Sequence, residues 1–322
     1  MFLKRLTPDS VVIGAPAKIN LFLEVLGKRH DGYHNINSLF QAVSLFDRLT
    51  FTKCPWAADL PVCPSHKNGQ TRTSAAHKTA GIKTTLSPTG EITNLDCGPD
   101  NLIAKAYRAV QKSYPDLGGV AVTLEKNIPT AAGLGGGSSD AAATVLALND
   151  LYELNMPQNL MVEIGLSVGS DIPFFFTKGQ AIVNGRGETC TPVQLPIDYW
   201  VVLVTAGTKE STASAYRALS ERGLTNPKPP FMLTSCQSAR ELVLQLKLAG
   251  NDFEKIHPQF YPELASIKDE LLRCGALLAR MSGSGPAVVG LFADPPPAGI
   301  DAIGNERGWR IHTVRPIVFS GT

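Results

Sequence analysis

The segment that most restricts the fold is a cluster of glycines and serines between a predicted strand and a predicted helix. This first glycine loop, residues 129–140, reads Pro-Thr-Ala-Ala-Gly-Leu-Gly-Gly-Gly-Ser-Ser-Asp. Apolar alternation over 120–124 predicts the strand, and the alanine-rich run 138–151 predicts the helix. Glycines allow close approach of the backbone to a ligand, and the free N–H groups at a helix start bind phosphate. The pattern therefore predicts a strand, a phosphate-binding loop and a helix.

Two common nucleotide-binding motifs do not match the first glycine loop. A Walker A loop ends in Gly-Lys-Ser/Thr, and no lysine follows these glycines. The dinucleotide fingerprint requires glycine where this chain has Ser138. The serines can instead contact a phosphate or its Mg²⁺, and Asp140 is expected in the first turn of the helix, where the macrodipole favours a carboxylate. A tight turn followed by a serine cap is the structural alternative.

Two charged residues interrupt apolar stretches elsewhere. Asp171, in the run Gly-Ser-Asp-Ile-Pro-Phe at 169–174, has the position of a catalytic base or a metal ligand. Its alternative role is a turn or a helix cap. Lys18 lies in the apolar stretch 11–26, and buried lysines are rare unless they meet a carboxylate or a ligand phosphate. A surface lysine on an edge strand is the alternative.

A second glycine loop covers residues 280–286, Arg-Met-Ser-Gly-Ser-Gly-Pro, between two predicted strands. It lacks the Gly-x-Ser-x-Gly pattern, which excludes a nucleophile elbow. A tight hairpin is the alternative to a ligand-binding loop.

The order of the predicted elements favours an α+β fold, because strands and helices are interleaved without a regular βαβ alternation. We expect strands at 11–26 (two segments joined at 15–18), 41–52, 120–124, 200–205, 276–281 and 287–292, and helices from 101 onwards, at 138–151, at 158–166 and at 263–273. Residues 54–99 are rich in Thr, Ser, Pro, Gly, Lys and His, and they predict a long, loop-like surface insertion with at most one weak hairpin. The length of 322 residues predicts two domains, 1–168 and 169–322.

Charge and hydropathy restrict the partners. A net charge of +2 does not favour a nucleic-acid partner. The sequence contains no run of about 18 apolar residues, so it does not predict a membrane-spanning helix. The first residues become polar too early for a secretory signal, so we expect a cytoplasmic protein. Cys63 and His66, with Cys54 and His77 nearby, form an irregular zinc pattern, for which a solvated insertion is the simpler explanation. The sequence does not indicate an oligomeric state.

Taken together, these motifs resemble the GHMP kinase superfamily. The first glycine loop resembles its phosphate-binding motif, Lys18-Ile-Asn20 its N-terminal motif, and Ser282–Gly285 its C-terminal glycine motif. Four runs narrow the resemblance: Pro-Ala-Lys-Ile-Asn-Leu-Phe-Leu at 16–23, Asp-Gly-Tyr-His at 31–34, Gly-Leu-Gly-Gly-Gly-Ser-Ser at 133–139 and Gly-Ser-Asp-Ile-Pro-Phe at 169–174. They are similar to the members that phosphorylate cytidine diphosphate methylerythritol in the non-mevalonate isoprenoid pathway. The resemblance covers nearly all of the chain outside 54–99.

The resemblance implies a two-domain kinase with its active site in the cleft between the domains, acting with ATP and Mg²⁺ on the 2-hydroxyl of that small-molecule substrate. It implies Asp171 as the catalytic base and Lys18 as its assistant. The residues implied for ATP are Asn101, Lys126, Pro129, Gly133, Leu134, Gly135, Gly136, Gly137, Ser138 and Ser139, with Ser139 beside Mg²⁺. The residues implied for the substrate are Asn20, Tyr33, His34, Asp171, Thr212 and Tyr216, with the rings of Tyr33 and Tyr216 on either side of the cytosine.

Two alternative functions remain open at this point. One is another kinase of the superfamily, acting on homoserine, mevalonate or a sugar, and the run Asp-Gly-Tyr-His at 31–34 argues against it. The other is a non-catalytic metabolite sensor with the same fold. The presence of both Lys18 and Asp171 argues against a sensor.

Overall fold

The computed structural model groups the chain into two compact units. It describes residues 1–54, 81–87, 90, 92, 95–207, 212–224, 229–256 and 260–319. The first unit comprises 1–16, 46–128 and 136–176, and the second comprises 17–45, 129–135 and 177–322. These units alternate along the chain, whereas the domains predicted from the sequence are continuous. The division into 1–168 and 169–322 stays a prediction.

Two long strands, β2 (Ser10–Lys28) and β3 (His34–Cys54), run through both units. We expected a break in β2 at 15–18, and this prediction is wrong. Proline's fixed φ is compatible with an extended chain, and proline lacks only the N–H donor, so Pro16 need not interrupt a strand. Burial of nearly every residue from Ala15 to Val25 keeps the strand continuous beyond this position.

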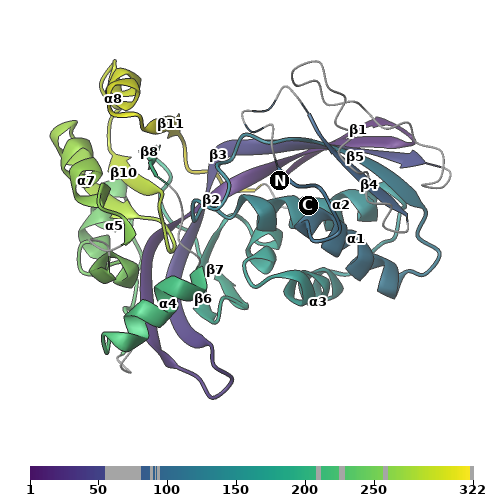
Figure 1. Ribbon diagram of the computed structural model, residues 1–322, viewed down its shortest axis with the longest axis horizontal. Helices are drawn as coiled ribbons and strands as arrows, with labels where there is room; N and C mark the ends of the chain where they lie inside the picture. The colour runs from purple at the N-terminus through teal and green to yellow at the C-terminus, as the bar shows by residue number, and fades with distance from the viewer. Residues whose placement is uncertain are drawn as a thin grey trace. The chain divides into compact units, whose positions relative to one another are not determined.

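In the first unit, helices cover a sheet in which the strand order is β1–β2–β3–β5–β4. Its other strands are β1 (Phe2–Thr7), β4 (Ile82–Leu86) and β5 (Gly119–Glu125). The helices are α1 (Leu102–Ser113), α2 (Gly136–Leu151), α3 (Gln158–Val168) and the short 3₁₀ helix η1 (Ile172–Phe176). Figure 1 shows α1, α2 and α3 together on one side of β1, β4 and β5.

The structure confirms the predicted strand–loop–helix order around the first glycine loop, with two corrections nearby. Helix α2 begins at Gly136, two residues earlier than expected, so Asp140 lies beyond its first turn. The second correction concerns 54–99, which contributes a strand to the main sheet. Strand β4 lies within this range and pairs in parallel with β5, with Ile82 opposite Val120. A segment of five residues is too short to show a period, and its partner strand is distant in sequence. Cys63, His66 and most of the insertion lie outside the described residues.

The second unit contains β6 (Gln180–Gly185), which pairs antiparallel with the first half of β3, and β7 (Thr189–Pro192), which pairs with β6. A separate antiparallel sheet has the order β11–β8–β10–β9. Its strands are β8 (Trp200–Thr205), β9 (Leu278–Met281), β10 (Val288–Phe292) and β11 (Arg310–Val314). These bounds confirm the predicted strands on both sides of the second glycine loop.

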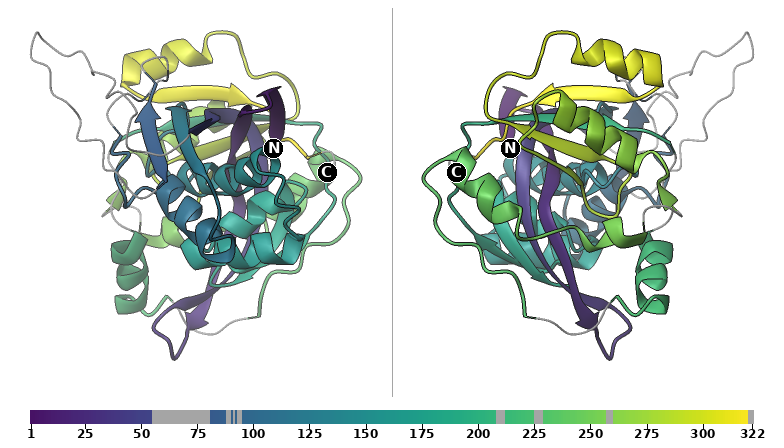
Figure 2. Two further views of the ribbon diagram at one scale, coloured as in Figure 1. Left: turned by 90° about the vertical axis from the view of Figure 1, so that its right-hand side faces the viewer. Right: turned by 90° about the vertical axis from the view of Figure 1, so that its left-hand side faces the viewer.

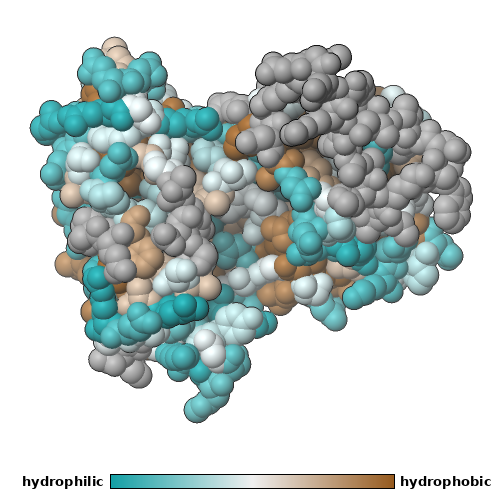
Figure 3. Space-filling model, viewed as in Figure 1, coloured by the Kyte–Doolittle hydropathy of each residue, from teal (hydrophilic) through white to brown (hydrophobic). Residues whose placement is uncertain are grey.

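The helices of the second unit are α4 (Thr212–Glu221), α5 (Ala239–Leu246), α7 (Leu264–Arg273), α8 (Ile300–Arg307) and the 3₁₀ helix η2 (Asp252–Ile256). Apolar residues of α4, α7, α8 and η2 share one buried cluster with the four-stranded sheet. Figure 2 shows α8, in yellow, running along β11. Hydrophilic side chains cover the outer sides of α4 and α8 in Figure 3, so both helices bury one face only. The α+β class is confirmed.

Among the described helices, none combines the length and the apolar character that a bilayer span requires.

Candidate active site

Lys18 and Asn20 lie side by side on β2 in the second unit. Both are buried, with 4% and 1% of their surfaces exposed. The Lys18 Nζ donates a hydrogen bond to Asn20 Oδ1 at 2.7 Å and lies 4.5 Å from the centre of the Phe40 ring. Asn20 Nδ2 in turn donates to Ser38 Oγ at 2.9 Å. These contacts fix the direction of the ammonium group and exclude the surface-lysine alternative.

The two glycine loops meet beside these residues. Ser282 Oγ accepts a hydrogen bond from Asn20 N at 3.1 Å and donates one to Gly133 O at 3.2 Å. The backbone N–H of Lys18 donates to Leu134 O at 2.9 Å. The structure therefore brings together Lys18 and Asn20 of β2, Gly133 and Leu134 of the first glycine loop, and Ser282 of the second.

Gly133 cannot be replaced without moving a loop. Its φ is +82°, and an added Cβ would lie 2.4 Å from Ser282 O. We expect Gly133→Ala to weaken ATP binding at least 10-fold, because left-handed strain of about 1–3 kcal/mol combines with a backbone clash. Isothermal titration of ATP measures this effect. Gly275→Ala is the matched control, since its φ is +98° and nothing lies within 4 Å of the added Cβ. Equal ATP affinities in the two variants would contradict the expectation.

Four of the residues predicted for the substrate lie at two places in the second unit: Tyr33 and His34 lie where β3 begins, and Thr212 and Tyr216 lie on α4. Thr212 Oγ1 is 3.2 Å from Ser284 Oγ, so the start of α4 contacts the second glycine loop. The rings of His34 and Tyr216 stack with centroids 4.9 Å apart and planes 13° apart. Tyr33 is 56% exposed, and the Arg186 guanidinium lies 5.1 Å from its ring centre. The structure thus pairs Tyr216 with His34, and the aromatic sandwich of Tyr33 and Tyr216 stays a prediction.

A buried triad closes the base of the first glycine loop in the first unit. Lys126 Nζ donates to Asp140 Oδ2 at 2.7 Å and also to Asp47 Oδ2. Asp47 Oδ1 accepts the N–H groups of Asn127 at 2.7 Å and Ile128 at 2.9 Å. All three charged side chains are at most 4% exposed. The triad links β3, the residues that precede the loop and the helix that follows it.

Charge balance within the triad is incomplete, because two carboxylates face one ammonium group. Burial lowers the pKa of Lys126, but the charges of Asp140 and Asp47 outweigh burial and raise its pKa overall. Burial raises the pKa of Asp140, although the charge of Lys126 opposes this shift. Asp140 Oδ1 is buried and has no hydrogen-bond partner among the described residues. The ammonium group of Lys126 is occupied by this triad, and its implied contact with adenine stays a prediction.

The starts of α1 and α2 lie close together in the first unit. Asn101 caps α1, since its Oδ1 accepts the N–H of Ile103 at 2.9 Å. A Cβ on Gly137, in the first turn of α2, would lie 3.2 Å from Leu102 Cδ1. Ser139 Oγ is fully buried and has no hydrogen-bond partner among the described residues. An orphaned hydroxyl at a helix start fits a phosphate oxygen or a Mg²⁺ ion.

Asp171 directly precedes η1, whose residues Ile172, Pro173, Phe174 and Phe175 are buried. These apolar anchors fix the backbone on which the half-buried carboxylate stands. Asp171 belongs to the first unit and Lys18 to the second.

Four polar residues that support the loops were missed by sequence analysis: Asp47, Asn251, Glu254 and Tyr261. Their partners are distant in sequence, and no apolar period marks them. One signal in the sequence could have indicated two of them. In the run Asn-Asp-Phe-Glu at 251–254, three polar residues surround a single phenylalanine, which is buried in the structure. Glu254 Oε1 accepts the N–H of Met281 at 2.7 Å.

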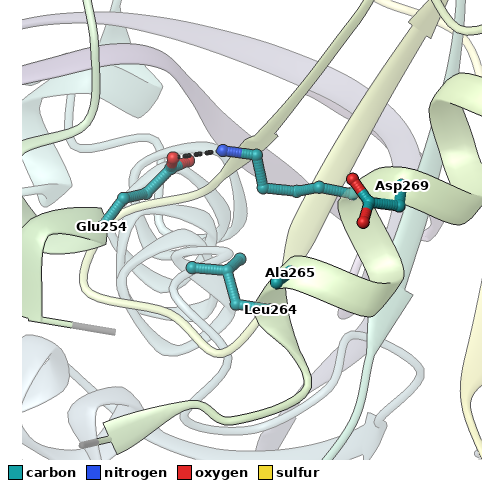
Figure 4. Close-up of a pocket in the computed structure, with 5 residues that line it drawn as sticks. Glu254, Leu264, Ala265 and Asp269 are labelled. Carbon is teal, nitrogen blue, oxygen red and sulfur yellow. Dashed lines mark hydrogen bonds and ion pairs between the residues drawn. The ribbon is translucent and has the colours of Figure 1, made fainter. Parts of the chain in front are cut away.

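A pocket of about 240 Å³ lies where η2 approaches α7. It is lined by Glu254, Leu264, Ala265, Lys268 and Asp269. In Figure 4, the dashed contact of Glu254 is its ion pair with Lys268. No residue predicted for catalysis or binding lines this pocket, so we do not assign the reaction to it.

Comparison with known families identifies both parts of the chain. Residues 101–179 match the family described as GHMP kinases N terminal domain, and residues 235–305 match GHMP kinases C terminal. A crystal structure of a 4-(cytidine 5'-diphospho)-2C-methyl-D-erythritol kinase has a TM-score of 0.68 at 28% identity, covering 96% of this chain and 100% of that one. A homoserine kinase from Cytophaga hutchinsonii has a TM-score of 0.65 at 14% identity, covers 100% of this chain and 98% of its own, and shows the shared fold.

Curated relatives extend over nearly the whole chain. A protein from Moorella thermoacetica named 4-diphosphocytidyl-2-C-methyl-D-erythritol kinase is 37% identical, covering 89% of this chain and 91% of its own length. A protein of the same name from Citrifermentans bemidjiense is 36% identical, covering 94% and 98%. The chain is an ATP-dependent kinase, as its relatives are. It belongs to the GHMP kinase superfamily and, within it, to the family of 4-diphosphocytidyl-2-C-methyl-D-erythritol kinases.

Proposed function

We propose that this kinase transfers the γ-phosphoryl group of ATP to the 2-hydroxyl of 4-diphosphocytidyl-2-C-methyl-D-erythritol, in the non-mevalonate route to isoprenoid precursors. The observation that carries this proposal is the identity of 36–37% to kinases of that name, over 89–94% of the chain. The buried arrangement of Lys18, Asn20 and the two glycine loops supports it, because phosphoryl transfer depends mainly on positioning and charge neutralisation.

In the proposed reaction, Asp171 accepts the proton of the attacking hydroxyl. General base catalysis of this kind contributes about 10²- to 10⁴-fold to a rate. The positive charge of the Lys18 ammonium, which Asn20 orients, favours loss of the proton from the attacking hydroxyl. The backbone N–H groups of residues 133–139 hold the phosphate oxygens, and the start of α2 adds its positive dipole end.

The proposal includes Mg²⁺ next to Ser139. The buried Oγ of Ser139, which has no partner among the described residues, fits an oxygen ligand for this ion. When bound, the ion neutralises charge on the phosphate oxygens. Clusters of three or more His, Cys, Asp or Glu side chains suited to a metal are absent from the described residues.

Cytosine recognition by Tyr33 and Tyr216 is the part of the proposal that sets specificity. Tyr33→Ala and Tyr216→Ala should each raise the KM for the cytidyl substrate about 10- to 100-fold, because stacking on a base contributes about 1–3 kcal/mol. The KM for ATP should stay unchanged, and Tyr33→Phe, which keeps the ring, should retain the wild-type KM. A wild-type KM for the cytidyl substrate in both alanine variants would contradict the proposed stacking of cytosine between Tyr33 and Tyr216.

An acceptor panel tests the function itself. ADP release is measured with 4-diphosphocytidyl-2-C-methyl-D-erythritol, homoserine, mevalonate and galactose, and phosphorus NMR identifies the phosphorylated position. We expect turnover with the cytidyl substrate alone. Turnover with another acceptor would move the assignment within the superfamily, and ATP binding without any turnover would indicate a sensor.

A further inference from the structure

Asn251, between α5 and η2, uses both N–H groups of its side-chain amide to hold the second glycine loop. It is 4% exposed. Its Nδ2 donates hydrogen bonds to Met281 O and Gly283 O, both at 2.8 Å. Its Oδ1 accepts the N–H of Phe253 at 3.0 Å. A primary amide offers two N–H donors and a carbonyl acceptor, so no residue of the same size without an amide can make all three bonds.

The loop that Asn251 holds contacts residues of both predicted ligand sites. Ser282 Oγ accepts a hydrogen bond from Asn20 N and donates one to Gly133 O. Ser284 Oγ lies 3.2 Å from Thr212 Oγ1. A Cβ on Gly283 would lie 3.4 Å from both Asn20 Oδ1 and the Gly133 Cα, so the loop has little room to shift.

Two further side chains hold the same loop. Tyr261 OH donates to Ser284 O at 2.6 Å, and Glu254 Oε1 accepts from Met281 N at 2.7 Å. Asn251 is also joined to β2, because Leu23 forms an isolated parallel bridge with it and donates its N–H to Gly250 O at 2.9 Å. One short segment therefore connects β2, which carries Lys18 and Asn20, with the second glycine loop.

We propose that Asn251 is a positioning residue for phosphoryl transfer, which keeps Ser282 against Asn20 and Gly133 and thereby holds the first glycine loop at the reacting distance. This inference rests on the proposed kinase reaction and adds a residue that does not touch the reactants. A misplacement of about 1 Å in a catalytic group can cost about 10²-fold in rate. The second glycine loop can transmit such a shift, because it is hydrogen-bonded directly to Asn251 and, through Ser282, directly to Asn20 and Gly133.

The test replaces Asn251 by aspartate, which keeps the shape and removes both N–H donors. One carboxylate oxygen would then face the carbonyl oxygens of Met281 and Gly283. We expect kcat/KM for the cytidyl substrate to fall about 10²-fold in Asn251→Asp. We also expect faster hydrogen exchange at Ser282 and Ala287, whose N–H groups donate to Ala287 O and Ala132 O.

Gln41→Glu is the matched control for a structural effect. Gln41 is 1% exposed, and its Nε2 donates to Ala42 O at 2.8 Å and to Ile317 O at 3.0 Å. The chemical change is the same, but the carbonyls belong to other segments. Gln41→Glu should lower the melting temperature, yet keep the wild-type kcat and KM values below that temperature and the wild-type exchange rate at Ser282.

Tyr261→Phe is a milder variant that can be used if Asn251→Asp does not fold. It keeps the ring and removes the hydrogen bond to Ser284 O. We expect a loss of about 3- to 10-fold in kcat/KM, the value of one hydrogen bond.

The outcomes separate the inference from the proposed function. Unchanged exchange at Ser282 in Asn251→Asp, or an equal loss of kcat/KM in Gln41→Glu at the same folded fraction, would overturn the positioning role. Failure of the wild type to phosphorylate the cytidyl substrate would overturn the proposed function instead. The exchange measurements with and without ATP need no acceptor and still test whether Asn251 holds the loop.

Discussion

Asp171→Asn is expected to lower kcat about 10²- to 10⁴-fold while leaving the KM for ATP and the melting temperature nearly unchanged. The amide has the size of the carboxylate but cannot accept the proton of the attacking hydroxyl. The apolar residues of η1 that fix the backbone at this position are untouched by the substitution. Steady-state ADP release at saturating ATP and cytidyl substrate measures kcat, and circular dichroism measures the melting temperature.

Asp150→Asn is the control for this result. It removes the same charge from the same unit, where Asp150 forms a half-exposed ion pair with Arg5 at 3.2 Å. Its kcat should match that of the wild type. If Asp171→Asn kept a kcat within threefold of Asp150→Asn, the role of Asp171 as base would be withdrawn.

Lys126→Met is expected to lower the free energy of unfolding by about 3–5 kcal/mol at pH 7, because removing one partner of a buried ion pair leaves uncompensated charge. Here Asp47 and Asp140 would face each other without the ammonium group between them. The first glycine loop would lose the link between the residues before it and α2. Chemical denaturation followed by fluorescence measures the stability. The KM for ATP, which we expect to rise, measures the effect on the loop.

The effect of Lys126→Met should grow with pH. Burial raises the pKa of Asp140 to about 7 in the folded protein, whereas an aspartate in the unfolded chain has a pKa near 3.9. Between these two values the folded state binds more protons, so the free energy of unfolding falls as pH rises through this window. Without Lys126, the opposing charge is lost and the fall becomes larger.

Lys105→Met is the control, because Lys105 and Asp100 form an ion pair at 3.5 Å whose side chains are 42% and 94% exposed. An exposed pair of this kind contributes about 0–1 kcal/mol. Equal losses of stability in the two lysine variants would show that the buried triad has no special importance.

Local patterns allowed the prediction of the elements around the first glycine loop. Apolar alternation, an alanine-rich run and consecutive glycines are all read within a short window, and β5, the loop and α2 follow that order. The positions of Lys18 and Asp171 were equally visible as charges in apolar runs. Their proposed roles came from the resemblance, since neither charge alone distinguishes a base or its assistant from a structural residue.

The supports of the loops were not predictable in the same way. Lys126 and Asp47 are 79 positions apart, and Asn251 is 30 positions from Met281. Such pairs form only when tertiary packing brings distant segments together, and single polar residues carry no period. Lys126 illustrates this: resemblance assigned it to adenine, while its burial between two aspartates depends on the packing of β3 against α2.

The passage of β2 and β3 through both units has a consequence for synthesis on the ribosome. Residues 17–45 leave the ribosome early, yet the rest of their unit, 129–135 and 177–322, is made later. At the usual rate of about 5–20 residues per second, this segment waits on the order of ten seconds for residues 177 onwards. During that time, this leucine-rich hairpin lacks β6, the strand that pairs with the first half of β3. Chaperones that bind nascent chains are therefore expected to contact residues 17–45 before any other part of the second unit.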